Sequence, residues 1–257
     1  MKIKKIKILK NKVVVSLDND EKLELDKEIY TNFYLYEGKE LSKKEYNEIK
    51  ENNNVSALLR YALRIRSKAI YSEYQLREKL YKKEVSKKEV DQVIKILTQY
   101  NLVDDEAFTL DYVEYYNSLN YGKNKILNKL SEKGIFKDKL EKIKFPVTLE
   151  RKKAQNVYLR LLKKYERYNF SQKKEHLYNA YINMGFDCDI ALEMVDRVKE
   201  DDSKDEMKKL EKDYEKVYSR YSKKYQKKEL RQKVLQSLLQ KGYKMNDVLK
   251  VLERKMK

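Results

Sequence analysis

The sequence predicts a mainly α-helical protein, with tandem three-helix repeats in an elongated curved array after a small β-containing N-terminal extension. Three of the five glycines occupy the same place in a repeated pattern, four residues after the second of two apolar residues that are themselves four apart. Successive copies of the pattern lie 50, 51 and 57 residues apart. Self-similarity of this kind is typical of stacked supersecondary units. One proline and five glycines in 257 residues also argue against a loop-rich β fold.

The repeated pattern describes a helix that ends in a glycine turn. Its clearest structural positions are Leu76, Leu80, Gly134, Gly185 and Gly242. A glycine in this place is typical of a left-handed cap that directs the chain into the next helix. In the first copy Glu84 stands where the later copies have glycine. We therefore expect each repeat to hold three helices, the second and third joined by a very short turn.

The first part of the chain differs in composition from the repeats. Its short aliphatic segments, punctuated by asparagine and aspartate, predict a three-strand meander at residues 3–9, 13–17 and 22–25. A short helix is expected at 27–34, and Ser42 with Glu45 forms a capping box for a second helix. That second helix is predicted to end near residue 52, because Asn52-Asn53-Asn54 is interpreted as a linker.

Local signals divide the rest of the chain into repeats. A capping box at Ser86 and Glu89 begins the third helix of the first repeat. Pro146 closes the second repeat, because a helix does not run easily through proline. Asp201-Asp202 separates the third repeat from the fourth. The predicted domains are residues 1–53 for the meander and its helices, 54–106, 107–149 and 150–203 for the first three repeats, and 204–257 for a basic fourth repeat.

Positive charge is concentrated at the C-terminal end of the chain. The net charge is +18, and residues 204–257 hold 18 Lys and Arg against 8 Asp and Glu. Residues 1–53, by comparison, hold 12 against 11. An uneven excess of this kind favours a polyanionic partner that binds mainly through the fourth repeat. The alternative is that the lysines only form a solvated face.

The candidate binding residues lie in a basic stretch of the fourth repeat. They are Arg220, Tyr221, Lys223, Lys224, Tyr225, Lys227, Lys228, Arg231 and Lys233. The cations are expected to attract the phosphates of DNA or acidic protein surfaces. Most of the 23 tyrosines are expected to pack between helices, at spacings of three and four residues. Tyr221 and Tyr225 are interpreted as exceptions that stack on bases.

No catalytic, cofactor-binding or metal-binding residue is predicted. The single histidine, His176, has no second histidine or cysteine at ligand spacing, and no glycine-rich phosphate-binding loop occurs. The acidic cluster Asp104-Asp105-Glu106 directly precedes an amphipathic segment and is interpreted as the cap of that helix. The sequence therefore gives no positive case for an enzyme, and no cofactor is expected.

The sequence also bears on the cellular compartment. No apolar run approaches the roughly 20 residues needed to span a bilayer, and the N-terminus lacks a signal-peptide pattern. The single cysteine, Cys188, cannot form an internal disulfide, which is typical of a reducing cytoplasm. Cys188 falls at the start of a repeat helix and is expected to be a buried or half-buried packing residue. We expect a cytoplasmic protein without membrane contact.

The stretch from Ala57 to Ile135 resembles the RecX family of regulators of the RecA recombinase. The residues that carry the resemblance are Tyr61-Ala-Leu63, Ser72-Glu73-x-x-Leu76-x-x-Lys79-Leu80, Leu102-Val-Asp-Asp-Glu-Ala-Phe108 and Gly122-x-x-x-Ile126-x-x-x-Leu130-x-x-Lys133-Gly134-Ile135. These motifs are mostly structural, and it is their order and spacing together that carry the resemblance. The match departs from the family pattern at Glu84 and at Thr109.

The resemblance implies a non-enzymatic cytoplasmic regulator that binds RecA and RecA–DNA filaments and inhibits recombinase and coprotease activities. It would act in recombination, DNA repair and the SOS response. The expected partners are RecA, its filaments and single- or double-stranded DNA, with the protein itself monomeric. The residues alone leave two alternatives open. One is a general nucleic-acid-binding helical-repeat protein without a RecA target, and the other is a scaffold for a different protein.

Overall fold

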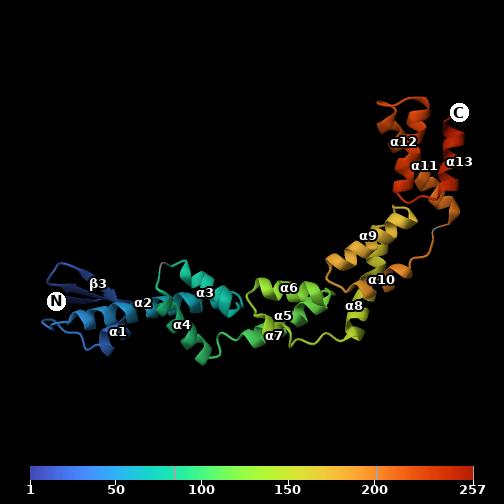
Figure 1. The fold of residues 1–257 in the computed structure, drawn as a ribbon. Coiled ribbons are helices and arrows are strands. Elements are labelled where there is room, and N and C mark those ends of the chain that lie inside the picture. The colour runs from blue at the N-terminus through green and yellow to red at the C-terminus, as the bar shows by residue number, and fades with distance from the viewer. Residues whose placement is uncertain (84, 201, 257) are drawn as a thin grey trace. The chain divides into compact units, whose positions relative to one another are not determined.

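The computed structural model has a small three-stranded sheet followed by helices, which confirms the predicted mainly α-helical fold class (Figure 1). It describes residues 1–83, 85–200 and 202–256. The predicted roles of Glu84 and Asp201 fall outside these ranges. The chain divides into two compact units, Met1–Asp111 with Leu130–Lys137, and Tyr112–Lys129 with Asp138–Lys257. The finer division into five domains stays a prediction.

The N-terminal sheet has the predicted meander. Its strands β1 (Ile3–Ile8), β2 (Val13–Leu17) and β3 (Lys22–Leu25) pair antiparallel in the order β1-β2-β3. In β2, the alternating residues Val13, Val15 and Leu17 are fully buried, because successive side chains of a strand point to opposite faces. They pack with Ile49 of α2 (Lys43–Arg66), so this helix covers one face of the sheet.

The helices of the described chain comprise one short helix and four groups of three helices, which we call repeats 1 to 4. The short helix α1 (Lys27–Asn32) follows the sheet and precedes α2. Repeat 1 consists of the second half of α2, α3 (Glu73–Tyr81) and α4 (Lys87–Gln99), and repeat 2 consists of α5 (Asp105–Ser118), α6 (Lys123–Glu132) and α7 (Lys137–Leu140). Repeat 3 consists of α8 (Val147–Lys164), α9 (Phe170–Asn183) and α10 (Cys188–Asp196). Repeat 4 consists of α11 (Ser203–Tyr221), α12 (Lys227–Gln240) and α13 (Met245–Lys255). Repeats 1, 3 and 4 each have a cluster of buried apolar residues drawn from all three helices.

The predicted linker at Asn52-Asn53-Asn54 is wrong, because α2 runs through it without a break. α2 begins at the predicted capping box of Ser42 and Glu45. Its first half packs in the core of the sheet and its second half in the core of repeat 1. Asparagine is a weak helix former, which is why the run of three suggested a linker. The sheet and repeat 1 are therefore joined by a continuous helix.

Asn53 and Asn54 form hydrogen bonds from α2 to two other segments of the chain. The Asn53 side chain accepts from the N–H of Asp26 (2.9 Å) and donates to the carbonyl of Glu24 (2.9 Å), at the end of β3. The Asn54 Nδ2 donates to Glu89 Oε1 in α4 (2.7 Å). These tertiary hydrogen bonds offset the weak helix propensity of asparagine and connect α2 to both of its neighbours.

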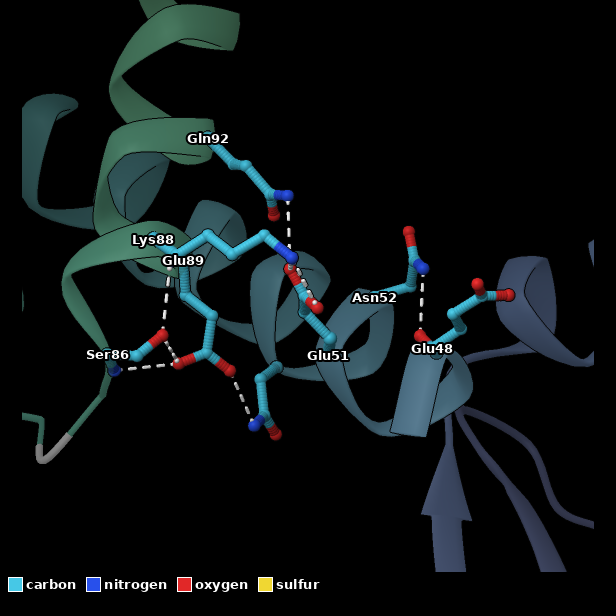
Figure 2. A network of polar contacts seen from close by, with 8 residues as sticks. Glu48, Glu51, Asn52, Ser86, Lys88, Glu89 and Gln92 are labelled. Carbon is cyan, nitrogen blue, oxygen red and sulfur yellow. Dashed lines mark hydrogen bonds and ion pairs between the residues drawn. The ribbon is translucent and has the colours of Figure 1, made fainter. Parts of the chain in front are cut away.

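The contact between α2 and α4 contains a small polar network (Figure 2). Glu51 of α2 accepts hydrogen bonds from Lys88 (2.9 Å) and Gln92 (3.2 Å) of α4. One turn away, Asn52 Nδ2 donates to the carbonyl of Glu48 within α2 (2.8 Å). All three asparagine side chains therefore have partners, that of Asn52 within α2 and those of Asn53 and Asn54 in neighbouring segments.

The third helix of repeat 2 is much shorter than predicted. α7 has only four residues, and the apolar residues Leu140 and Ile143 of this segment are half-buried. Most of the residues around them are charged, and Pro146 follows closely. Little apolar surface is therefore available to hold a longer helix against its neighbours.

The glycine turns have the predicted left-handed backbone. Gly134, Gly185 and Gly242 have φ of 81°, 89° and 85°. Residues other than glycine rarely adopt this backbone conformation. The apolar pair of the first copy, Leu76 and Leu80, is completely buried. The repeated pattern thus records both the buried face of the second helix and the turn that ends it.

Successive repeats are joined by a recurring hydrogen bond that was not predicted. The N-terminus of the second helix of one repeat meets the first turn of the first helix of the next repeat, where a backbone N–H donates to an acidic side chain. The three bonds are Glu73 N–H to Asp105 Oδ1 (2.8 Å), Lys123 N–H to Glu150 Oε2 (3.0 Å) and Phe170 N–H to Glu206 Oε1 (2.6 Å). The unpaired N–H groups and the dipole of a helix N-terminus favour a carboxylate at this place. Each carboxylate therefore caps the helix of a neighbouring repeat.

The glycine turn completes the same junction. The carbonyl just before each left-handed glycine accepts a hydrogen bond from the residue that precedes the second helix of the previous repeat. The three bonds are Ser72 Oγ to Lys133 O (2.5 Å), Gly122 N–H to Met184 O (2.9 Å) and Asn169 Nδ2 to Lys241 O (2.8 Å). The carbonyl is available because the helix that contains it ends at the glycine.

A lysine one turn after the acidic residue adds a further bond in two of the junctions. Lys153 Nζ donates to the carbonyl of Tyr121 (2.7 Å), and Lys209 Nζ donates to the carbonyl of Tyr168 (3.0 Å). The Lys153 ammonium also lies 2.5 Å from Glu150 Oε1, and both side chains are at most 3% exposed. A buried charge is costly unless it is paired, so this pair depends on the junction being closed.

The junction between repeats 2 and 3 also brings two backbones close together. A Cβ atom added to Gly122 would overlap the backbone of Gly185, and one added to Gly185 would overlap the backbone nitrogen of Lys125. The Asn124 N–H donates to the carbonyl of Gly185 across this contact (3.0 Å). Glycine is required here for the close approach as well as for the turn.

We predict that Gly185→Ala lowers the free energy of local opening at the Asn124 amide by about 3 kcal/mol, because strained φ and backbone overlap act together. Amide hydrogen exchange measures this free energy. Gly38 is the matched control, since its φ is 93° but no atom lies within 4 Å of an added Cβ. Gly38→Ala should cost only about 1 kcal/mol at its own turn. Equal costs at the two sites would show that the close approach contributes nothing.

The network of Figure 2 predicts a pH dependence for the contact between α2 and α4. Burial alone would raise the pKa of Glu89, but hydrogen bonds from Asn54 and Ser86 outweigh it and hold the pKa below its ordinary value. A lowered pKa means that the stabilisation is present above the unfolded-state pKa and is lost as pH falls through the folded-state pKa. The melting temperature of Glu89→Gln should therefore lie below that of the wild type near neutral pH, and the difference should shrink below about pH 4. A difference that stays constant with pH would contradict this.

Candidate nucleic-acid interface

The nine predicted binding residues lie together at one corner of repeat 4. α11 ends at Tyr221, a loop of residues 222–226 follows, and α12 begins at Lys227. The Tyr225 N–H donates to the carbonyl of Tyr221 (2.9 Å), which closes a single turn between the two helices. The last turn of α11, this loop and the first two turns of α12 hold all nine residues. We call this region, Arg220–Lys233, the basic corner.

The cations of the basic corner are exposed and uncompensated. Lys223, Lys224, Lys227, Lys228 and Arg231 are all exposed, and none of them forms an ion pair with any described residue. Glu229 is the one carboxylate of the basic corner, and the cations outnumber it, so they create a positive potential that attracts polyanions. The potential is screened by salt, so binding at this corner must weaken as ionic strength rises.

Other cations of repeat 4 are paired with carboxylates. The pairs are Lys208–Asp205, Lys241–Asp213, Lys244–Glu200, Lys250–Asp247, Arg254–Glu211 and Lys255–Glu215. Pairs between exposed side chains contribute little to stability, but they neutralise the local charge. The excess charge of the fourth repeat is therefore concentrated at the basic corner.

The two tyrosines of the basic corner are partly buried. Tyr221 and Tyr225 pack against the apolar core of repeat 4, with their ring centres 6.0 Å apart. The Lys233 ammonium lies 5.8 Å from the ring centre of Tyr225. Both rings therefore support the fold of the corner, as most tyrosines were expected to do. Their predicted role in stacking on bases stays a prediction.

Repeat 3 carries one arginine–tyrosine pair at the place that corresponds to the basic corner, which the charge totals do not reveal. The interval of 57 residues between repeats 3 and 4 aligns Arg167 with Lys224 and Tyr168 with Tyr225. The Arg167 guanidinium lies 4.9 Å from the ring centre of Tyr168. Residues 150–203 hold 11 Lys and Arg against 10 Asp and Glu, so this pair is masked in the total. Applying the repeat interval to the basic stretch would have found it.

The remaining chemistry-bearing side chains lie elsewhere. Cys188 is exposed at the first residue of α10, so its predicted burial is wrong; a helix start leaves the side chain of its first residue in solvent. His176 packs between the rings of Tyr165 and Tyr168, with centres 5.4 Å and 4.2 Å away. Asp104 accepts from the N–H groups of Glu106 and Ala107, which confirms its predicted role as a helix cap.

The described residues hold neither a membrane-spanning helix nor a cluster of metal ligands. No helix there is long and apolar enough to cross a bilayer. No group of three or more His, Cys, Asp or Glu side chains in those residues is arranged to hold a metal ion. The basic corner itself holds seven cations, two amides, one hydroxyl, two phenols and one carboxylate, Glu229, and this set is suited to binding anions by charge and hydrogen bonds.

Comparison with known proteins identifies relatives of similar length. No protein family model matches the chain. A curated protein of Leuconostoc mesenteroides subsp. mesenteroides, named Regulatory protein RecX, is 30% identical over 206 residues, which cover 77% of this chain and 76% of that protein. A protein of the same name from Clostridioides difficile is 28% identical over 208 residues, covering 79% of this chain and 97% of that protein.

A solved structure has a similar fold. The crystal structure of a regulatory protein RecX aligns with a TM-score of 0.63 and 21% sequence identity. The alignment covers 76% of this chain and 99% of that chain. At this level of identity the likeness concerns the fold alone.

We predict that neutralising four cations of the basic corner weakens binding to single-stranded DNA and flattens its salt dependence. The variant changes Lys223, Lys224 and Lys228 together with Arg231 to glutamine. Because each lost phosphate contact lowers the slope of log K against log salt by about 0.7, the slope should fall by up to about 3. Fluorescence anisotropy with a labelled oligonucleotide over a salt series measures it.

The matched control removes the same charge from paired cations of repeat 4. Glutamine replaces Lys208, Lys244, Lys250 and Lys255, each of which has a carboxylate partner. The control should keep most of the wild-type affinity and slope. If both variants lose affinity equally, net charge rather than the basic corner determines DNA binding.

Proposed function

Since the chain belongs to the RecX family of regulatory proteins, we propose that it is a non-enzymatic, negative regulator of the RecA recombinase. In this proposal it binds RecA and RecA–DNA filaments and restrains recombination, DNA repair and the SOS response. The family name is that of regulators, and the relatives reported above carry it. The proposal places the protein in the cytoplasm as a monomer.

One observation carries the proposal beyond the family name, namely the uncompensated cations of the basic corner. A RecA–DNA filament is a repeating polyanion, with phosphates at regular intervals along the DNA. The exposed cations of the basic corner, with Arg167 at the place that aligns with Lys224, suit a partner of this kind because they can bind neighbouring anionic sites. Charge supplies affinity and a high association rate, and the family relation supplies the identity of the protein partner.

Negative regulation follows if the protein bridges neighbouring RecA subunits. Extension and turnover of a filament require that subunits add, leave and change their contacts. A chain of several helical repeats that binds more than one subunit opposes these changes, because every bound repeat must be released before a subunit moves. Small amounts of the protein are then sufficient to affect a long filament.

The second candidate function is a general nucleic-acid-binding helical-repeat protein without a RecA target. It is favoured by the same basic corner, because binding by lysine and arginine to phosphates needs no protein partner. This candidate predicts equal binding to DNA with or without RecA. A scaffold for a different protein, the remaining alternative, predicts weak DNA binding that low salt does not improve.

We expect substoichiometric amounts of the protein to lower the DNA-dependent ATPase activity of RecA on preformed single-strand filaments. The physical reason is that one bound molecule restrains several subunits. The assay titrates the protein against filaments at amounts too small to coat the DNA. The basic-corner variant should inhibit less than the wild type, and the control with four paired lysines replaced should inhibit as the wild type does.

A mobility shift on RecA-free DNA accompanies the ATPase assay. Inhibition at amounts that do not shift free DNA would establish a filament regulator. Clear binding to free DNA with no effect on RecA would contradict the proposal and favour the general nucleic-acid-binding protein.

A further inference from the structure

Repeat 4 retains the segment by which each earlier repeat binds its successor. In every repeat a tyrosine precedes the residue before the second helix and the first two residues of that helix, and we call these four residues the docking segment. The docking segments are Tyr71–Tyr74, Tyr121–Asn124, Tyr168–Ser171 and, in repeat 4, Tyr225–Lys228. The interval of 57 residues between the last two is the interval that relates the apolar pattern of repeats 3 and 4.

An occupied docking segment receives the start of a helix. At the third junction Phe170 N–H donates to Glu206 Oε1 (2.6 Å), and Lys209 Nζ donates to the carbonyl of Tyr168 (3.0 Å). Glu150 and Lys153 make the equivalent two bonds at the second junction, as described above. The occupant in both cases is the first turn of a helix that carries glutamate and, three residues later, lysine. Its carboxylate and its ammonium bond neighbouring groups of the docking segment.

The docking segment of repeat 4 has no occupant within the described chain. No hydrogen bond is made there to the carbonyl of Tyr225, and Gln226 makes no side-chain capping bond to α12. Lys227 has φ of 46°, whereas the equivalent residue Phe170 lies outside the left-handed region. The carbonyl of Tyr225 and the N-terminus of α12 therefore lack a bond from another repeat, and they lie among the cations of the basic corner and its one carboxylate, Glu229.

We propose that the docking segment Tyr225–Lys228 binds the first turn of an α-helix of a partner protein. That turn carries an acidic residue followed three residues later by a lysine. The surface continues an interface that the chain forms three times within itself, and the occupants of that interface provide the chemistry. The acidic residue of the partner would cap α12, and its lysine would reach the carbonyl of Tyr225.

Charge complementarity supports an acidic occupant. The basic corner places unpaired cations next to the docking segment, and the equivalent place in repeat 3 is occupied by Glu206. A DNA phosphate also fits the positive charge, but a phosphodiester donates no hydrogen bond. It would leave the carbonyl of Tyr225 without a partner, whereas a Glu-x-x-Lys turn satisfies both groups. The observations therefore favour a protein helix over DNA at this segment.

A second copy of this chain does not offer the same occupant from its own first repeat. In repeats 2 to 4 the first helix begins at the junction, which places its first turn in contact with the previous repeat. In repeat 1 the first helix is α2, which runs without a break from the sheet into the repeat. No helix start exists there to enter the docking segment of another copy, so the partner is a different protein.

The direct test is an NMR titration of the ¹⁵N-labelled full-length chain with a synthetic peptide of residues 202–221. This peptide contains the Glu206-x-x-Lys209 turn that occupies the docking segment of repeat 3, and its acidic and basic residues are equal in number. The expected result is a dose-dependent shift of the amide signals of Tyr225–Lys228. The control peptide with Glu206→Ala and Lys209→Ala is also charge-balanced, and it should bind at least about tenfold more weakly.

Each outcome of the titration decides the proposal. Shifts at Tyr225–Lys228 with the first peptide and not with its control support it. Equal shifts with both peptides, or no shifts with either, overturn it. A short oligothymidine in place of peptide tests the other occupant, and shifts with the oligonucleotide alone would assign the segment to DNA and overturn the proposal. Light scattering of the free chain should show a monomer, and a dimer that Gln226→Asp abolishes would make a second copy the occupant.

A matched pair of variants separates docking from folding. Gln226→Asp places a carboxylate at the N-cap of α12, which stabilises the helix but repels an acidic occupant. Gln226→Asn has the same shape without the charge and resembles Asn169 of repeat 3. We expect the aspartate variant to lose peptide binding by at least about tenfold with no loss of melting temperature, and the asparagine variant to keep it. Equal binding by the two variants would contradict the proposal.

The same pair of variants tests whether RecA is the partner, a step that rests on the proposed function. Binding to DNA-free RecA that is lost in Gln226→Asp and kept in Gln226→Asn would make RecA the source of the helix. If both variants bind RecA as the wild type does while the peptide titration is positive, the docking segment stands and RecA binds elsewhere. If the wild type does not bind RecA, the proposed function fails and the peptide titration still decides the docking segment.

Discussion

The carboxylate that caps a helix of the preceding repeat is the interaction on which the order of the repeats depends. A helix N-terminus exposes N–H groups that no residue of its own helix can accept. At three junctions the next repeat supplies an acidic side chain to these groups and a carbonyl to the residue before them. The carbonyl is free only because a left-handed glycine ends its helix. The glycine pattern and the junction therefore depend on one another.

The junction also explains where the chain is open to partners. Asp105, Glu150 and Glu206, in the first turns of α5, α8 and α11, each cap a helix of the preceding repeat and are therefore bonded within the chain. Five other carboxylates of repeat 4, Asp205, Glu211, Asp213, Glu215 and Asp247, pair with its lysines and Arg254. The last docking segment has no occupant within the described chain, and the cations around it outnumber the one nearby carboxylate, Glu229. The docking segment without an occupant in the described chain is thus also the one surrounded by unpaired cations, which connects the fold to the proposed function.

The features that the sequence predicted are those that local chemistry determines. The glycine turns were predictable because few other residues adopt a left-handed backbone, and the basic corner because its cations are adjacent in the chain. The linker at residues 52–54 was wrongly predicted, because the bonds of Asn53 and Asn54 come from segments far away in the sequence. The junction was missed because Asp105 and Glu206 lie in first turns, where capping of their own helices is an equally good explanation. Which lysines are paired was unpredictable, because many of their partners lie in other helices.

The measurement that tests the junction most directly is amide hydrogen exchange at Phe170 in Glu206→Ala. Its control is Asp205→Ala, since Asp205 lies in the same first turn but pairs with Lys208. The account predicts that Glu206→Ala lowers protection of the Phe170 amide by about tenfold or more, because a hydrogen bond to a charged acceptor contributes roughly 1.5–3 kcal/mol. Asp205→Ala should leave that amide unchanged. Loss of protection confined to α11, with Phe170 protected as in the wild type, would contradict the claim that each repeat caps the one before it.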